Sequence, residues 1–339
     1  MSFMNLPGIK VILFAALLSQ TAYGCIWDSD TLNSERARFP GIGVLISGSF
    51  ARHSKEFHQW RIQQREKDIA SDKSLPWHFD DLAVSQHKLG DHQAAIQTML
   101  RKDKLVPGLY ETCSNLGTFY IYTGDLQEAL RWIEKALAIN ANAHFGREKY
   151  QKWLVEWVLE EQTLPAALQG DSGEINWMTP GFARYVARQE AGGLPASATQ
   201  QLTLTTKQRA DAIRGVTGMI FFADFDNPLL QEALGDLLMA GDLRDNAANL
   251  AGLCYMHAAL KAPNEKEKTR LTEKCKESGR TSMGFDMTKV EASLKSALLK
   301  GAAYHESVRQ DEMKWIAAGL DASAEFQKKY LVQSSPAAP

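Results

Sequence analysis

The sequence lacks the short patterns that mark common enzyme classes. It has no G-x-S-x-G, no H-E-x-x-H, no G-x-x-x-x-G-K-[ST], and no G-x-G-x-x-G that follows a strand and opens a helix. It also has no basic stripe, and its formal net charge is only −2. Nothing therefore indicates binding to nucleic acid or to an anionic membrane surface. These absences favour a binding protein over an enzyme, and we expect neither a cofactor nor a metal.

Cysteine is scarce, with four in 339 residues and none in a C-x-x-C pair. A zinc knuckle or a thioredoxin-type motif is therefore not expected. Cys113 is predicted to be a buried, inert thiol. Cys254 and Cys275 fall on two predicted helices on either side of a turn at 261–264. In an oxidising compartment these two could form a disulfide that joins the helices, and the alternative of two free thiols stays open.

One short apolar run stands out, from Val11 to Leu18 after Lys10. It is too short to cross a hydrocarbon core of about 30 Å, but it fits a secretory signal peptide over residues 1–24 that is cleaved after Gly24. We therefore expect export to the periplasm or cell envelope. Cys25 would then begin the mature chain, as in bacterial lipoproteins, so lipidation of Cys25 is an alternative to ordinary cleavage.

An internal repeat is the most informative feature that is present. Two stretches of the chain align at a constant offset of 34 residues. The matching pairs are Leu82 and Leu116, Ala83 and Gly117, Gly90 and Gly124, Asp91 and Asp125, and Ala95 and Ala129. Such a period is typical of arrays of helical hairpins, in which each unit buries its apolar face against the next.

The second of these stretches resembles a tetratricopeptide repeat (TPR). The residues at or near the signature positions of that family are Leu116, Gly117, Tyr120, Gly124, Ala129, Ile133 and Ala136. Small residues at 117 and 129 allow two antiparallel helices to cross closely. Gly124 is expected to end the first helix with a positive φ, and Asp125 to cap the second. The stretch 76–109 follows the pattern less closely, because Lys102 stands where a small residue is expected.

The predicted fold class is all-α, a right-handed helical-hairpin solenoid (a TPR-like array) with additional C-terminal helices. The break at 39–43 should precede an amphipathic helix over 49–69 that caps the first repeat. The connection at 161–206 should contain a short helix over 182–189. Within the helical region that follows it, a long helix is expected over 288–318. The expected segments are a signal peptide (1–24), a leader with a capping helix (25–73), the array (74–160, with repeats 76–109 and 110–143 and a closing helix 144–160), an irregular connection (161–206), a helical region with a degenerate hairpin (207–331), and a loose tail (332–339).

The resemblance implies a protein-binding groove lined by the first helix of each hairpin. The positions that would face it are Trp77, Asp80, Val84, His87, Lys88, Ser114, Thr118, Ile121 and Tyr122, with Glu148 and Lys152 added by the closing helix. A terminal carboxylate held as in chaperone-tail clamps is disfavoured, because Asp80 and Val84 replace the required lysine and asparagine and Glu111 adds negative charge. A partly apolar or basic protein segment is the expected partner.

We predict a non-enzymatic scaffold for protein interactions. A second hypothesis is a membrane-anchored lipoprotein accessory of an envelope assembly. A third is an enzyme with an unrecognised site between the helical halves, built from Asp224, Asp226 and His257. Asp224 and Asp226 could also hold a metal, but acidic and amide residues just before a helix that starts with proline are usually caps. The partner's identity and the oligomeric state are not predicted.

Overall fold

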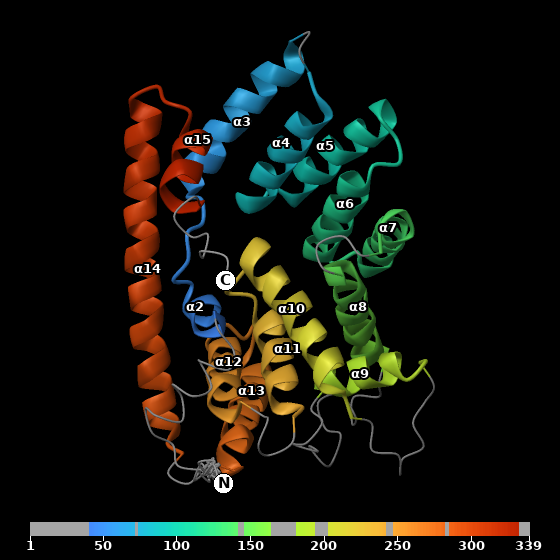
Figure 1. The fold of residues 1–339 in the computed structure, drawn as a ribbon, viewed down its shortest axis with the longest axis vertical. Coiled ribbons are helices and arrows are strands. Elements are labelled where there is room, and N and C mark those ends of the chain that lie inside the picture. The colour runs from blue at the N-terminus through green and yellow to red at the C-terminus, as the bar shows by residue number, and fades with distance from the viewer. Residues whose placement is uncertain are drawn as a thin grey trace, which may run out of the picture.

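A computed structural model of the protein describes residues 41–71, 74–141, 146–163, 181–193, 203–241, 247–281 and 285–331. Within these ranges all the regular secondary structure is helical, with fourteen α-helices from α2 to α15 that pack largely as consecutive hairpins (Figure 1). The predicted fold class is confirmed. None of these described helices is both long enough and apolar enough to span a membrane.

The TPR-like array is made of hairpins that follow the predicted repeats. Its helices are α3 (Lys55–Ala70), α4 (Pro76–Lys88), α5 (His92–Leu105), α6 (Tyr110–Thr123), α7 (Leu126–Ile139) and α8 (Arg147–Thr163). Each packs against the next in the chain, so the array curves around one side of the molecule (Figure 1).

The turn and the crossing inside the second repeat follow the predicted chemistry. Gly124 ends α6 with a φ of 81°, and the Asp125 side chain accepts a hydrogen bond from the backbone N–H of Glu128 at 3.1 Å. A Cβ atom on Gly117 would lie 2.6 Å from Cγ1 of Ile133. Only glycine therefore permits this close approach of α6 to α7.

The start of the described chain differs from the prediction. A short helix, α2 (Ile42–Ser47), begins inside the break expected at 39–43, of which residues 41–43 are described, and α3 begins at Lys55 instead of near Ser49. The cause is local: Gly41 and Gly48 both adopt positive φ angles around α2, and the hydroxyl of Ser54 caps α3 by accepting from the N–H of Phe57 at 3.2 Å.

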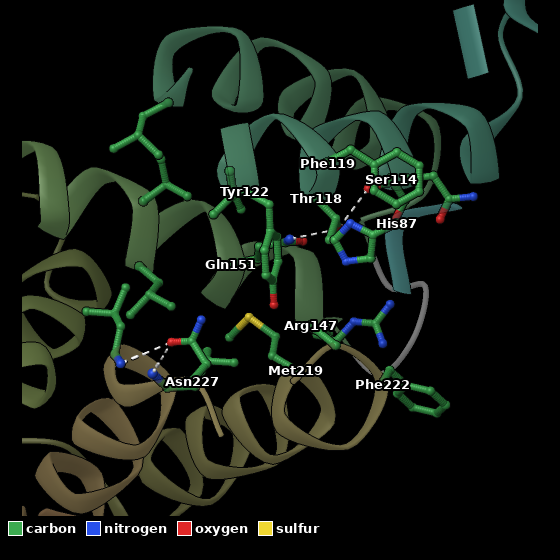
Figure 2. Close-up of a pocket in the computed structure, with 18 of the residues that line it drawn as sticks. His87, Ser114, Thr118, Phe119, Tyr122, Arg147, Gln151, Met219, Phe222 and Asn227 are labelled. Carbon is green, nitrogen blue, oxygen red and sulfur yellow. Dashed lines mark hydrogen bonds between the residues drawn. The ribbon is translucent and has the colours of Figure 1, made fainter. Parts of the chain in front are cut away.

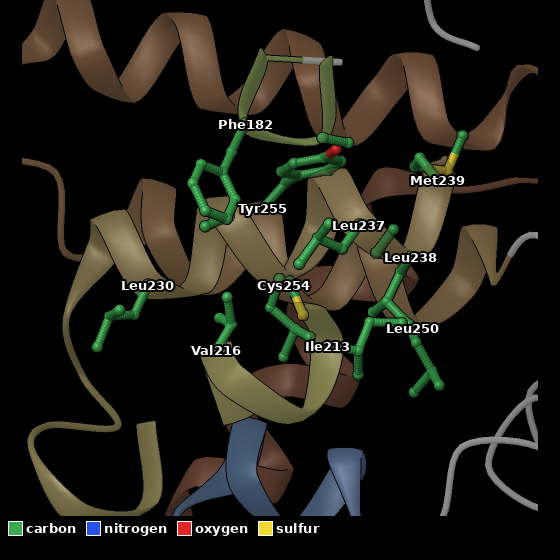
Figure 3. Packing of buried hydrophobic residues seen from close by; sticks show 14 of the residues in the cluster. Phe182, Ile213, Val216, Leu230, Leu237, Leu238, Met239, Leu250, Cys254 and Tyr255 are labelled. Atoms are coloured by element: carbon green, nitrogen blue, oxygen red, sulfur yellow. The ribbon is translucent and has the colours of Figure 1, made fainter. Parts of the chain in front are cut away.

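The C-terminal half is built around a second apolar core, to which α2 and α8 also contribute. It contains α9 (Gly181–Glu190), α10 (Thr206–Phe222), α11 (Pro228–Met239), α12 (Ala248–Leu260) and α13 (Glu265–Ser278), followed by a 3-10 turn at Gly279–Thr281. Side chains from α9 to α12 interdigitate there, and α12 is buried on nearly all sides (Figure 3). The short helix expected over 182–189 is α9, and its prediction is confirmed.

A buried carboxylate anchors α9 to this core. Oδ2 of Asp236 accepts from the backbone N–H of Phe182 at 2.9 Å, which caps the start of α9 from another helix. Oδ1 of the same side chain accepts from the hydroxyl of Tyr255 at 2.8 Å and lies 2.7 Å from Nζ of Lys274. Its negative charge is thus both paired and hydrogen-bonded, as burial requires.

The long helix α14 (Met287–Ala317) connects the two halves. It runs along one edge of the molecule, packs against α12, α2 and α3, and is followed by α15 (Ala322–Phe326) and a π-helix at Gln327–Leu331 (Figure 1). Near its end, Glu312 lies 2.6 Å from Nδ1 of His53 and accepts from the backbone N–H of Ser54 at 2.8 Å. The start of α3, the first helix of the array, is therefore attached to α14.

Candidate functional site

A cavity of about 580 Å³ lies where the inner face of the array meets the C-terminal half. We call it the central cavity. Helices α4, α6 and α8 form one wall, and the end of α10 with the start of α11 forms the other (Figure 2). It is lined by Val84, His87, Lys88, Ser114, Asn115, Thr118, Phe119, Ile121, Tyr122, Gly124, Leu126, Arg147, Gln151, Leu154, Val155, Val158, Met219, Phe222, Ala223, Asn227, Leu229 and Leu230.

The structure brings most of the predicted groove residues to this cavity. Those that line it are Val84, His87, Lys88, Ser114, Thr118, Ile121 and Tyr122. Trp77 is instead 48% exposed, with the guanidinium of Arg65 4.8 Å from its ring centroid. Nζ of Lys152 lies 3.1 Å from Oε1 of Glu134 and 3.4 Å from Oε1 of Glu156. Glu148 is buried and accepts from the hydroxyl of Ser114 at 3.3 Å.

Asp80, the remaining predicted groove residue, is paired inside the first repeat. Its carboxylate oxygens lie 2.6 and 2.7 Å from Nζ of the buried Lys102, and Asn115 donates to it at 3.3 Å. The expectation that Asp80 would repel a bound carboxylate is therefore corrected, because Lys102 neutralises it. The same contact explains how the first repeat tolerates a lysine where a small residue is typical.

A cluster of aromatic rings forms one part of the cavity wall, with His87 stacked on Phe119 and edge-on to Tyr122. The ring centroid of His87 lies 4.8 Å from that of Phe119 and 4.6 Å from that of Tyr122. Nδ1 of His87 is 3.0 Å from Nδ1 of His92. Burial, together with the nearby positive groups His92 and Lys88, lowers the pKa of His87 to about 3. The imidazole is therefore neutral at physiological pH, and the His87 ring adds no charge to the wall.

A hydrogen-bonded row of polar side chains crosses the middle of the wall. Nε2 of Gln151 donates to the hydroxyl of Thr118 at 3.0 Å, and that hydroxyl donates to the carbonyl of Ser114 at 3.1 Å. These contacts use the hydroxyl of Thr118 as both acceptor and donor. Apolar contact is thus the main chemistry that this part of the wall offers to a ligand.

The opposite wall belongs to the α10–α11 corner, which sequence reasoning did not place here. Nζ of Lys88 donates to the carbonyl of Phe222 at 2.8 Å and also to that of Ala223. These are the last carbonyls of α10, where a helix carries partial negative charge. Tyr122 reaches across the cavity toward Met219 and Asn227 (Figure 2). Lys88 and the two carbonyls that it binds are 134 and 135 residues apart in sequence, so no local pattern could reveal the contact.

The residues of the enzyme hypothesis are partly brought together. Nε2 of His257 lies 3.0 Å from Oδ1 of Asp226, and Nζ of Lys261 lies 2.9 Å from Oδ2. His257 is fully buried, and none of these three lines the central cavity. Asp224 accepts from the backbone N–H of Asp226 at 3.0 Å, which is a turn contact. The arrangement holds the α10–α11 corner to α12.

Helix α11, which follows this corner, is capped by Asn227 just before Pro228, as expected for an amide residue in that position. Oδ1 of Asn227 accepts from the N–H groups of Leu229 and Leu230 at 3.0 and 3.2 Å, and Pro228 begins α11. Among the residues that the structure describes, no group of three or more histidine, cysteine, aspartate or glutamate side chains could hold a metal ion.

The described cysteines are free thiols in the structure, in contrast to the disulfide considered from the sequence. Cys113, Cys254 and Cys275 are all buried. Sγ of Cys275 donates to the carbonyl of Gly252 at 3.2 Å. Burial raises the pKa of Cys275 to about 12 and that of Cys254 well above its usual value. Cys25 and the predicted signal peptide 1–24 lie outside the described residues.

Comparison with known proteins identifies one segment of the chain. Residues 110–142 match the family described as tetratricopeptide repeat. The match spans α6 and α7, and α6 supplies Ser114, Thr118, Ile121 and Tyr122 to the cavity. No curated protein matches the chain.

Proposed function

Because the chain contains a tetratricopeptide repeat, we propose that it is a non-enzymatic scaffold that binds a protein partner in the central cavity. One observation supports this above the others. Inner-face residues predicted from the repeat pattern converge on a single cavity, although they come from α4 and α6, two successive hairpins.

The shape of the site limits what a partner can present. A volume of about 580 Å³ falls within the range of about 300–1,000 Å³ that is usual for small-ligand pockets. The α10–α11 corner closes the side opposite the array, so a broad folded surface cannot lie along α4 and α6. A short segment with a few inserted side chains fits better.

Export to the cell envelope is part of this proposal and rests on the pattern in residues 1–24. It is tested by measuring the intact mass of the protein purified from the native host. Cleavage after Gly24 with an unmodified Cys25 would support a freely exported protein. An added acyl mass on Cys25 would show the membrane-anchored alternative, and an intact residue 1–24 segment would contradict export.

Partner binding is tested by site-specific photo-crosslinking in the native cell. A benzophenone side chain replaces Tyr122 in the cavity, and the matched control replaces Gln310, which is exposed on α14. We expect one dominant protein to be captured from position 122 and not from 310. Equal capture from both positions, or none from 122, would contradict the proposal.

A further inference from the structure

The charged residues that line the central cavity have one sign. They are Lys88 and Arg147, and no carboxylate side chain is among the lining residues. Both lie at the Phe222 end: Lys88 binds the Phe222 carbonyl at 2.8 Å, and the guanidinium carbon of Arg147 is 5.3 Å from the Phe222 ring centroid. The cavity therefore has a cationic end.

The acidic groups nearest to this end do not change the sign of the lining. Glu148 is 1% exposed, and its Oε1 lies 3.4 Å from a guanidinium nitrogen of Arg147. Asp224, next to the carbonyls that Lys88 binds, does not line the cavity, but its negative charge raises the pKa of Lys88. Burial outweighs that effect and lowers the pKa of Lys88 overall. A cation that has lost part of its hydration interacts more strongly with a carboxylate that reaches it.

The rest of the cavity is apolar and connects two cores. Phe119 belongs to the apolar core of the array, whereas Leu154 of α8 shares a second core with Met219 and Leu230 of the C-terminal half. All four also line the cavity. An apolar side chain inserted there would contact both cores at once, and its burial would supply most of the binding free energy.

From this charge and polarity pattern we propose that the partner segment is apolar and carries an aspartate or glutamate beside its inserted side chains. The inference rests on the proposed function and specifies the chemistry of its ligand. Of the partly apolar or basic segment expected from the sequence, it keeps the apolar character and reverses the charge. The expected charge rested in part on Asp80, whose charge Lys102 neutralises at 2.6 Å.

The test is a selection of random dodecapeptides displayed on phage against the full mature chain. A parallel selection uses Thr118→Trp, in which a bulky ring fills the middle of the cavity, and peptides enriched on both proteins are discarded as binding elsewhere. Among the peptides that remain, we expect aspartate and glutamate to exceed lysine and arginine at least threefold beside leucine, isoleucine or phenylalanine. In synthetic copies, changing the acidic residue to its amide should weaken binding about tenfold, as for a lost charge-assisted hydrogen bond.

A charge-reversed protein provides the second measurement. Arg147→Glu should reverse the preference, so that lysine and arginine become enriched, whereas Lys266→Glu on the exposed face of α13 should leave it unchanged. Urea unfolding of both variants confirms that the fold is retained. If Arg147→Glu does not fold, Arg147→Gln must reduce the acidic preference at least threefold.

The outcomes separate this proposal from the proposed function. Enrichment of basic or uncharged peptides on the natural chain, with capture of one partner from position 122, would overturn the acidic ligand and leave partner binding intact. Binding of free acyl carboxylates in competition with the selected peptides, with no partner captured, would assign the cavity to small amphipathic anions and overturn both. An acidic preference that Arg147→Glu leaves unchanged would also overturn the proposal.

Discussion

Nζ of Lys102 lies 2.6 Å from Oδ2 of Asp80, and this ion pair joins the two helices of the first repeat. Lys102 is 2% exposed and stands where the repeat pattern expects a small side chain. With a small residue at this position, α4 and α5 could pack closely together. Here the Lys102–Asp80 pair occupies the space between the two helices. It also removes a negative charge from the inner face of the array.

Removal of the positive charge of Lys102 is expected to destabilise the protein even when an apolar side chain of similar length is kept. Lys102→Met leaves the carboxylate of Asp80 without its cation in a largely buried position, so we expect about 3 kcal/mol less stability in urea unfolding. The double variant with Asp80→Asn should recover at least half of that loss, since no unpaired charge remains. Equal losses in the single and double variants would show that the ion pair contributes little.

Protonation of buried histidines should destabilise the protein below neutral pH. Burial, followed by the positive charges of Arg61 and His53, lowers the pKa of His58 to about 2. His58 binds a proton near pH 6.5 in the unfolded state but not in the folded state. The free energy of unfolding is therefore unaffected by His58 above pH 6.5 and decreases as the pH falls below that value. His58 alone should account for about 2 kcal/mol between pH 7 and pH 5.

The measurement is urea unfolding at pH 7, 6 and 5 on the natural chain and on His58→Gln. The variant should show a shallower loss of stability by about 2 kcal/mol across this interval. His87→Gln should behave in the same way, because burial lowers the pKa of His87 to about 3. Identical pH profiles for all three proteins would contradict the assignment of neutral buried imidazoles.

The contact of α14 with α2 should depend on the absence of a side chain at Gly301. A Cβ atom there would lie 1.9 Å from the carbonyl oxygen of Ser47. Gly301→Ala must therefore push the two helices apart, at a cost of about 1–3 kcal/mol. Hydrogen exchange should become faster in residues 42–47, whereas Ala302→Ser on the exposed side of α14 should leave it unchanged.

The buried thiols should resist alkylation in the folded protein. Burial raises the pKa of Cys113, Cys254 and Cys275, and the thiolate is the reactive form. With iodoacetamide at pH 8, we expect no modification of these three in the native state and complete modification in urea without a reductant. If Cys254 and Cys275 stay unmodified in urea until a reductant is added, they form the disulfide considered from the sequence.

Local patterns in the sequence were sufficient to predict the array and most helices. The 34-residue offset and the glycine, aspartate and alanine positions reflect backbone geometry within one hairpin, which neighbouring residues determine. The long helix expected over 288–318 is α14, Met287–Ala317. The start of the chain was less accurate, because the Ser54 cap and the two positive-φ glycines around α2 outweighed the spacing of apolar residues.

The far wall of the cavity could not be predicted in this way. Met219, Phe222 and Asn227 reach Lys88 and Tyr122 only through tertiary folding. The charge of the groove was misread for a related reason. No sequence pattern pairs Asp80 with Lys102, which is 22 residues away on the next helix.

The contact of Glu312 with His53 and Ser54 has a mechanical consequence. An open helical array can act as a spring whose radius changes when a partner binds, because each unit touches only its neighbours. Here α14, whose 31 residues extend about 46 Å at 1.5 Å per residue, fastens the first helix of the array to the opposite half of the molecule. These contacts hold the array at a set curvature. A partner must therefore fit that curvature instead of changing it.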